Sequence, residues 1–424
     1  MSPKVISLIV FIGVYVFIIF NIIPRSIIAL AGVIVLILFG VLSPHDMVTY
    51  VNWEALGLIF GMFVLVQVLK ESGFFDYLSI VILKKTRGIP ILILFSFALL
   101  AGFLSAFMDS ITVLLFMSVL SIEIAKKLKI SPIPFVLSQI TATNIGGSAT
   151  MMGDPPNVII GTGLNITLTQ FVRYLAPLSF LILLLNTGYF VFYYRKTFLL
   201  LKPMEESYLK NLDPREKVND FTLMISTVIS FLITVTLLFL HRKLNLPVGL
   251  VGLIGASLAL ILSGKKMEHI WGLIEWEVLV FFSTLFIIVG SLEKTNVIAS
   301  LSRTIVSATS GNTTLLKGVL LWLSAIISGF IDNVPFAASM VPVLKNIISL
   351  GINISLVSLG LLVAFGVDVG GNFTPIGASA NVVGITMLSK AGVEITWKDY
   401  LKVVVPITLL NIFIACFAFL IFFK

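Results

Sequence analysis

Four aspartates lie inside strongly apolar segments of the chain, where a carboxylate is costly: Asp109, Asp154, Asp332 and Asp368. A charged side chain at the centre of a bilayer costs about 2.5–3.5 kcal/mol on insertion scales, so each aspartate needs a partner or a function. A buried carboxylate can bind Na⁺ or H⁺, and exchange of one for the other is the minimal chemistry of an antiporter. These four residues are therefore the centre of a candidate ion site.

Three of the aspartates also have a structural interpretation. Asp109 and Asp332 each precede a segment that can form a helix, and an aspartate there can cap the free N–H groups of the first turn. Asp154 precedes two prolines and could simply form a turn. Capping and ion binding are compatible, so both interpretations stay open at this point.

Polar residues and glycines lie near these aspartates in the sequence and complete the predicted substrate or ion site. They are Ser110, Asn144, Gly146, Gly147, Thr150, Asn157, Asn333, Gly370, Gly371, Asn372, Thr374, Ser379 and Asn381. Oxygen ligands suit hard cations, and Asp109 and Asp332 are the candidate Na⁺ ligands. No catalytic residue and no cofactor are expected, and H⁺ and possible Na⁺ are the coupling ions.

The second half of the chain repeats landmarks of the first. Pro24, Trp53-Glu54 and Asp109 return 223 positions later (247 − 24, 276 − 53, 332 − 109) as Pro247, Trp276-Glu277 and Asp332. One position further out of step, NIGGSATMMGDPPNVIIG (144–161) returns as DVGGNFTPIGASANVVGI (368–385). A duplicated apolar chain with polar, glycine-rich breaks at matching places is the pattern of a secondary transporter.

These two segments cannot form continuous helices. Pro155 and Pro156 in the first, and Pro375 in the second, lack N–H groups, and the glycines free the backbone to turn. A broken helix exposes carbonyl oxygens at one end and N–H groups at the other, and carbonyl oxygens can coordinate cations. Each break is therefore a predicted binding site near the middle of the membrane.

The composition places the chain in a lipid bilayer. Of 424 residues, 58% are hydrophobic and only 11% are charged, whereas a soluble domain carries about 25% charged residues. The net charge of +8 is assigned to cytoplasmic loops, and no nucleic-acid partner is expected. Cys416 is the single cysteine, so no disulfide can form within the chain.

The apolar runs predict an all-α membrane protein of ten spans. The predicted spans are 5–21, 25–42, 54–69, 134–164, 172–194, 219–240, 247–263, 277–292, 354–388 and 401–423. The segments 89–125 and 315–348 are predicted to be re-entrant hairpins, each with an aspartate at its tip. Five crossings per half make the second half inverted relative to the first. The halves are 1–194 and 219–424, joined by a charged linker at 195–218.

The distribution of basic residues predicts the orientation. Most of the 28 Lys and Arg, including Arg25, Lys265 and Lys266, are assigned to one side, which should be cytoplasmic. The linker is then cytoplasmic, and both termini are extracellular. The expected location is the plasma membrane.

The paired motifs carry a resemblance to a known family. DSITVLLFMSVL (109–120) with the first break, and IDNVPFAASMVPVL (331–344) with the second, resemble the ion transporter superfamily. The nearest branch is the one that holds arsenite permeases, NhaD-type sodium/proton antiporters and the pink-eyed dilution (P) protein. The resemblance covers nearly the whole chain. It implies a scaffold domain, about 25–69 and 247–292, that forms a homodimer, and a transport domain, about 89–164 and 315–388, that moves against the scaffold as in an elevator mechanism.

The hairpin tips depart from one pattern of this superfamily. In the related dicarboxylate carriers, a Ser-Asn-Thr at each tip binds the substrate carboxylate and sodium, whereas this chain has Asp109-Ser110-Ile111 and Asp332-Asn333-Val334. An anion about 4 Å from a tip carboxylate would be repelled by about 4 kcal/mol at an effective dielectric of about 20. Citrate-like and succinate-like substrates are therefore disfavoured.

The sequence thus favours proton-coupled ion exchange that exports Na⁺ or arsenite. A sodium-coupled importer of dicarboxylates or citrate is the alternative, and a passive channel is the alternative from another class. The contexts of Asp109 and Asp368 do not match those of intramembrane aspartyl proteases, and no phosphate-binding loop of the GxxxxGK[ST] type occurs.

Overall fold

The computed structural model describes residues 1–20, 23–264 and 267–422. Over these residues the secondary structure consists of helices, without any β-strand, which confirms the predicted all-α class. The end of the first predicted span at residue 21, the end of the last at residue 423, and the basic residues Lys265 and Lys266 lie outside the described residues.

The first half and the linker contain the first twelve helices. They are α1 (Pro3–Phe20), α2 (Arg25–Leu38), α3 (Pro44–Tyr50), α4 (Trp53–Glu71), α5 (Phe74–Lys85), α6 (Pro90–Ser105), α7 (Ser110–Leu128), α8 (Ile133–Gly147), α9 (Pro155–Gly163), α10 (Leu168–Leu199), α11 (Glu206–Asn211) and η1 (Pro214–Lys217).

The second half follows the same order. Its helices are α12 (Phe221–Leu240), α13 (Val248–Ser263), α14 (Met267–Leu273), α15 (Trp276–Lys294), α16 (Val297–Ala308), α17 (Thr313–Ser328), α18 (Asn333–Ser349), α19 (Leu356–Gly370), η3 (Gly371–Phe373), α20 (Ser379–Lys390) and α21 (Trp397–Phe422).

Each predicted span corresponds to a helix or to a helix pair. The two segments predicted as hairpins are helix pairs, α6–α7 and α17–α18, and the two segments predicted as broken are α8–α9 and α19–α20. Outside the linker, four short helices, α3, α5, α14 and α16, were not predicted. They too repeat, since α3 and α14 begin 223 positions apart, as do α5 and α16 (267 − 44, 297 − 74).

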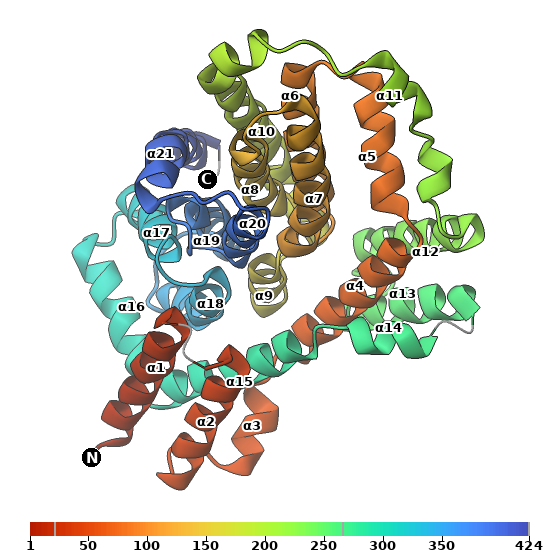
Figure 1. Cartoon of the computed structure of the whole chain (residues 1–424). Helices are drawn as coiled ribbons and strands as arrows, with labels where there is room; N and C mark the ends of the chain where they lie inside the picture. Colours follow the sequence, from red (N-terminus) through yellow and green to blue (C-terminus); the bar gives the residue numbers. More distant parts are fainter. Residues whose placement is uncertain (21–22, 265–266, 423–424) are drawn as a thin grey trace.

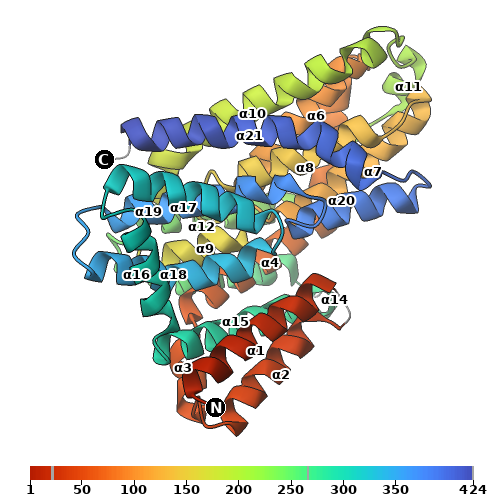
Figure 2. The ribbon, with the colours of Figure 1, turned by 90° about the vertical axis from the view of Figure 1, so that its left-hand side faces the viewer.

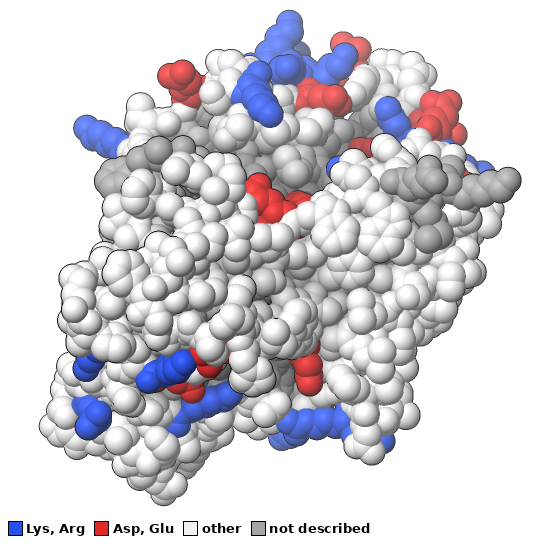
Figure 3. All heavy atoms as spheres, turned by 90° about the horizontal axis from the view of Figure 1, so that it is seen from below, with Lys and Arg blue, Asp and Glu red and all other residues white. Residues whose placement is uncertain are grey.

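The outside of the molecule is suited to a bilayer. Among the described residues, six helices are long and apolar enough to cross a membrane, namely α4, α10, α12, α15, α19 with η3, and α21. Figure 3 shows charged side chains gathered mainly toward two opposite edges of one face, with a broad uncharged region between them. Lipid tails can cover such a region without desolvating a charge.

One part of the molecule is built on a very close contact between α4 and α13 (Figure 1). A Cβ atom at Gly61 would lie 2.2 Å from the carbonyl oxygen of Gly252, and one at Gly57 would lie 3.0 Å from the Cα atom of Gly249. The two backbones therefore touch, as small residues allow in membrane helices. Helix α12 packs on α13, and α1 and α2 pack on α15.

The other part holds the hairpins and the broken helices, and its two repeats interlock (Figures 1 and 2). Within each repeat a hairpin helix packs on the first half of the broken helix, α6 on α8 and α17 on α19. Between repeats, α7 packs on α20 and α9 packs on α18. Each hairpin is thus completed by the second half of the broken helix from the other repeat.

Candidate functional site

The candidate site forms where two hairpin tips meet two helix breaks. Helix α6 ends at Ser105 and α7 begins at Ser110, while α8 ends at Gly147 and α9 begins only at Pro155. In the second half, α17 ends at Ser328 and α18 begins at Asn333, and residues 374–378 separate η3 from α20. Both breaks predicted from proline and glycine are present.

The two breaks are held by the same set of hydrogen bonds. Nδ2 of Asn157 donates to the carbonyl oxygens of Gly147 at 2.8 Å and Thr150 at 3.1 Å. Nδ2 of Asn381 donates to Gly371 at 2.7 Å and Thr374 at 2.8 Å. These amides therefore use their donors to stabilise the breaks.

The threonines of the breaks attach each loop to the adjacent hairpin. Oγ1 of Thr374 donates to the carbonyl oxygen of Gly329 at 2.5 Å, and Oγ1 of Thr150 donates to that of Ala106. Thr150 and Thr374 were predicted to belong to the substrate or ion site, and the structure places their hydroxyl groups on backbone carbonyls of the hairpins.

The glycines of the predicted site allow close backbone contact. A Cβ atom at Gly146 would lie within 1.9 Å of the carbonyl oxygen of Gly102, and one at Gly370 would lie 2.3 Å from the Cα atom of Ala325. Gly147 and Gly371 lie in the same tight region of their breaks: a Cβ at Gly147 would lie 2.5 Å from Oδ2 of Asp154 and one at Gly371 would lie 3.0 Å from Cβ of Ala378.

Asp109 caps α7, as the structural interpretation predicts. Its Oδ1 accepts hydrogen bonds from the backbone N–H groups of Ile111 at 3.0 Å and Thr112 at 3.1 Å. The residue is only partly buried and lines two neighbouring cavities. Capping therefore uses Oδ1 of Asp109 and leaves its Oδ2 outside the cap.

Asp154 does not cap the helix that follows it, which disfavours the turn-former interpretation. Its Oδ1 accepts hydrogen bonds from Ser110, at 3.2 Å from the backbone N–H and at 2.5 Å from the hydroxyl. The residue is 3% exposed, and its Oδ2 has no hydrogen-bond partner. Asp154 thus joins the first break to the first hairpin tip and presents an unpaired oxygen.

Asp332 differs from Asp109 because it has a cationic partner. Its Oδ1 accepts from the N–H of Val334 at 3.0 Å, and its Oδ2 accepts from Oγ of Ser379 at 3.1 Å. Nη1 of Arg25 lies 3.3 Å from the same Oδ2 and also donates to Ser379. The second tip is therefore neutralised by a positive charge from α2.

A small cavity of about 30 Å³ lies between the two tips and helix α15. This volume is of the order of one water molecule or one small ion. Its lining includes both tips, Asp154, the arginine of α2 and a glutamate that precedes α15: Arg25, Phe63, Asp109, Ser110, Ile111, Asp154, Pro155, Glu275, Val278, Phe282, Asn333, Val334, Ala378, Ser379 and Ala380.

Behind this cavity the two breaks meet through asparagines. Nδ2 of Asn144 donates to Oδ1 of Asn372 at 2.8 Å and to Oδ1 of Asn381 at 2.9 Å. Asp368, four residues before Asn372, is fully buried and has no hydrogen-bond partner at either carboxylate oxygen. These residues are close to the site but, unlike Asp154, do not line the cavity between the tips.

Two charged lining residues, Arg25 and Glu275, were not predicted from the sequence. Arg25 was assigned to a cytoplasmic loop, but the structure places it on Asp332. Glu275 was overlooked beside the repeated Trp276-Glu277 pair. A comparison of the repeats could have found both, since the positions that match them, Val248 and Asn52 (248 − 25 and 275 − 52 are both 223), carry no charge.

Within the described residues, no group of three or more His, Cys, Asp or Glu side chains is arranged to hold a metal ion. Hydroxyl, amide and backbone oxygens would have to complete the coordination of any cation bound between the tips. Ser110 and Asn333 are the polar non-carboxylate residues that the two tips contribute to the cavity. The cavity therefore offers a mixed set of oxygen ligands.

Comparison with known proteins identifies relatives of this architecture. The family model described as "Citrate transporter" (CitMHS) matches residues 15–360. A "46 kDa membrane protein" of Mycobacterium leprae is 30% identical over 417 residues and covers 97% of both chains. The P protein of Mus musculus is 28% identical over 484 residues, which is 94% of this chain and 58% of that protein. The resemblance to the P protein branch is therefore confirmed.

A solved structure shares the fold. The structure of Neisseria gonorrhoeae MtrF, from work whose title refers to a class of antimetabolite efflux pumps, aligns with a TM-score of 0.62. The alignment covers 100% of this chain and 95% of that chain at 14% sequence identity. At this identity the likeness describes the helical architecture alone.

Proposed function

Because the chain belongs to the citrate transporter (CitMHS) family, it is a multi-pass membrane transporter, and we propose that it exchanges protons for a small cation, with Na⁺ as the exported ion. One observation carries this proposal. The cavity between the tips is about 30 Å³ in volume and is lined by Asp109, Asp154 and Glu275, with Arg25 as the opposing charge. A small site with an excess of carboxylates suits a cation.

The unpaired oxygens favour the first hairpin as the place where the ion binds. Oδ2 of Asp154 has no hydrogen-bond partner, and Asp109 uses its Oδ1 to cap α7. Oδ2 of Asp332, in contrast, already contacts Arg25 and Ser379. We infer that Asp109, Asp154 and the Ser110 hydroxyl supply the ligands, and that Asp332 has an indirect role.

Arsenite is the second candidate for export, and the site offers less for it. Near pH 7 arsenite is mostly neutral, and thiols would hold it best. The single cysteine, Cys416, lies on α21 against the ring of Trp322, and is absent from the lining of the cavity. Neutral arsenite would depend on hydrogen bonds to the polar breaks.

Citrate import remains the alternative that the name of the family model suggests. A trivalent anion would need a larger and more positive site than the one between these tips, where Arg25 is the cationic lining residue. A coupling cation bound first at Asp109 could reduce the repulsion. We therefore treat citrate as the competing outcome of the experiment.

The proposed movement is that of an elevator. The hairpins and broken helices would move together against a scaffold that contains α2, α4, α13 and α15 and that forms a homodimer. Few polar contacts join the two parts, among them Arg25 to Asp332 and Nδ2 of Asn52 to Oγ1 of Thr162 at 2.8 Å. Such contacts can break and re-form at moderate cost.

The test is exchange in liposomes that contain the purified protein and an internal pH dye. A proton flux that saturates with Na⁺ or Li⁺ supports the proposal, and Asp109→Asn should abolish it while retaining the cap of α7. Glu394→Gln, a change in an exposed carboxylate, is the control and should leave the flux unchanged. Flux triggered by arsenite alone indicates arsenite export, Na⁺-dependent citrate uptake refutes the proposal, and non-saturating conductance indicates a channel.

A further inference from the structure

Asn144 and Asp368 occupy matching positions in the two repeats, and so do Asn157 and Asn381 (368 − 144 and 381 − 157 are both 224). At the pair Asn144 and Asn381, a hydrogen-bond donor is matched with an acceptor. Nδ2 of Asn144 donates to Oδ1 of Asn381 at 2.9 Å, and both residues are at most 1% exposed. A buried donor therefore meets a buried acceptor across the junction between the repeats.

At the matching pair, Asp368 and Asn157, the donor is missing, because a carboxylate takes the place of the Asn144 amide. Nδ2 of Asn157 already donates to two backbone carbonyl oxygens, so the orientation of this amide is fixed and its Oδ1 faces the other way. That Oδ1 has no hydrogen-bond partner, and neither has either oxygen of Asp368, the residue that takes the place of Asn144 in the matching pair. Both residues are fully buried. Each unsatisfied buried acceptor costs about 1–3 kcal/mol, and a hydrogen atom between the two residues would satisfy one acceptor on each.

We propose that Asp368 carries the proton that the transporter exchanges, and that this proton forms a hydrogen bond from the Asp368 carboxyl group to Oδ1 of Asn157. The protonated carboxyl group then reproduces the Asn144–Asn381 contact of the other repeat. The exchange of this proton rests on the function proposed above, whereas the hydrogen bond rests on the orientation of Asn157 and on the match with Asn144 and Asn381.

The proton and the cation occupy different places in this arrangement. Asp368 is absent from the lining of the cavity between the tips, while Asp154 lines it. Asp154 belongs to the same break as Asn157, whose backbone N–H donates to the carbonyl oxygen of Asp154 at 3.0 Å. The nearby hydroxyl of Tyr400 on α21 instead donates to the carbonyl oxygen of Asn372 at 3.1 Å.

This placement supplies a coupling mechanism. A negative Asp154 favours the protonated form of Asp368 because two nearby negative charges repel each other. When Na⁺ binds at Asp154 it cancels that charge, the O–H bond of Asp368 breaks, and the proton passes to water. One positive charge enters the site as one leaves it, so the net charge of the buried region is conserved.

The first test uses Asp368→Asn, whose amide can donate to Oδ1 of Asn157 as the carboxyl group does. The variant should be as stable as the wild type in detergent, and an infrared spectrum of the wild type should contain a protonated-carboxyl band that the variant lacks. Glu394→Gln is the matched control and should keep the band. A wild-type spectrum without that band, or one unchanged by Asp368→Asn, would overturn the proposal.

The second test is proton release in the liposome assay. Asp368→Asn should bind Na⁺ but release at least tenfold fewer protons than the wild type. Proton release at the wild-type rate in this variant would overturn the assignment of the exchanged proton. If the wild type itself moves no protons with any cation, the proposed function fails. The inference is then decided by the infrared band, which should weaken when Na⁺ is added to the purified wild type.

Discussion

Arg25 of α2 and Asp332 at the tip of the second hairpin form an ion pair with an Nη1–Oδ2 distance of 3.3 Å. The guanidinium group also lies over the ring of Phe281, 5.2 Å from its centroid. The pair connects the proposed scaffold to the proposed transport domain. It also makes the two repeats unequal, because Asp109 at the matching tip lines the cavity and is held by the backbone N–H groups of Ile111 and Thr112, whereas Asp332 is held by a cation.

Removal of the guanidinium charge should strengthen cation binding. In Arg25→Gln the site loses its opposing positive charge, which at roughly 8 Å and an effective dielectric of about 20 contributes about 2 kcal/mol. We expect the Na⁺ concentration for half-maximal exchange to fall by roughly 30-fold. Arg25→Lys keeps the charge and should stay near the wild-type value. An unchanged or raised Na⁺ requirement in Arg25→Gln would contradict this role.

Asp154→Asn should impair exchange as strongly as Asp109→Asn. The sequence alone predicts a milder effect, since Asp154 could be a turn former, but its carboxylate holds Ser110 and lines the cavity. We expect a loss of at least about 100-fold in Na⁺-dependent flux. Ser110→Ala removes the hydroxyl donor but not the charge, so it should lower stability by about 1 kcal/mol and flux only moderately. Near-normal flux in Asp154→Asn would restore the turn-former interpretation.

A covalent link between the two parts of the molecule should stop transport. Nδ2 of Asn52 at the start of α4 lies 2.8 Å from Oγ1 of Thr162 on α9, so cysteines at these positions are close enough to be linked. The double variant Asn52→Cys/Thr162→Cys, with Cys416→Ser to remove the native thiol, should lose exchange on oxidation and regain it on reduction. Undiminished exchange in the oxidised protein would favour a mechanism in which this contact does not move.

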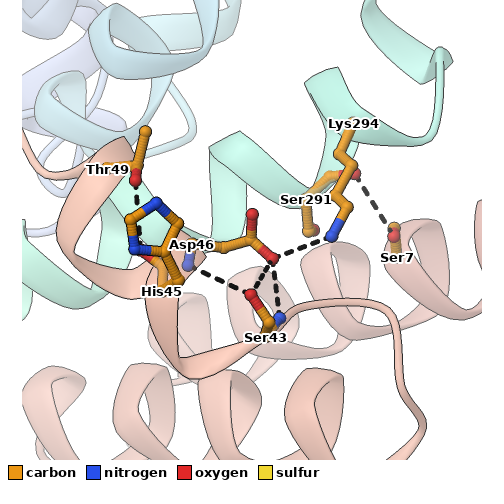
Figure 4. A network of polar contacts seen from close by, with 7 residues as sticks. All are labelled: Ser7, Ser43, His45, Asp46, Thr49, Ser291 and Lys294. Atoms are coloured by element: carbon orange, nitrogen blue, oxygen red, sulfur yellow. Dashed lines mark hydrogen bonds and ion pairs between the residues drawn. The ribbon is translucent and has the colours of Figure 1, made fainter.

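The contact between α3 and α15 should make stability depend on acidic pH (Figure 4). Lys294 donates to Asp46 at 2.8 Å, and Ser43 donates from its N–H at 2.6 Å and its hydroxyl at 2.8 Å. The Lys294 ammonium group, together with Ser43, lowers the pKa of Asp46 from 3.8 to about 2.

Because the pKa is lower in the folded protein, the stabilisation is fully present above about pH 4 and is lost as the pH falls toward about 2. In Lys294→Met the main cause of the lowered pKa is removed, so the melting temperature should depend less on pH over this interval. Thermal unfolding in detergent from pH 5 to pH 2 measures the difference. Parallel curves for wild type and variant would refute the proposed contribution.

The sequence was sufficient to predict the helix order and both breaks, because proline, glycine and long apolar runs act locally. Helices α5 and α16 were not predicted, since each has only 12 residues and α5 ends in two lysines. Their existence depends on packing between elements.

Of the residues that line the cavity, the sequence singled out Asp109, Ser110, Asp154, Asn333 and Ser379, but not the partners of these side chains. Composition and spacing identified Asp109, Asp154, Asp332 and Asp368 as intramembrane carboxylates. The sequence could not show that Arg25, 307 positions away, would neutralise one of them. It also could not show that Nδ2 of Asn157 would donate to the carbonyl oxygens of the break, because side-chain orientation depends on the folded break.

Helices of the first repeat are covered by helices of the second, and this packing has a consequence for biosynthesis. The face of α4 formed by Gly57 and Gly61 is covered by α13, α7 is covered by α20, and α9 is covered by α18. A nascent chain that ends before α13 has therefore inserted the first hairpin and the first break without the surfaces that cover them. Such contacts are distant in sequence, which slows folding and prolongs the exposure of polar groups to lipid. The first half should consequently depend on the insertion machinery or on a co-expressed second half for its survival, and quality control should act on it until the last helices have entered the membrane.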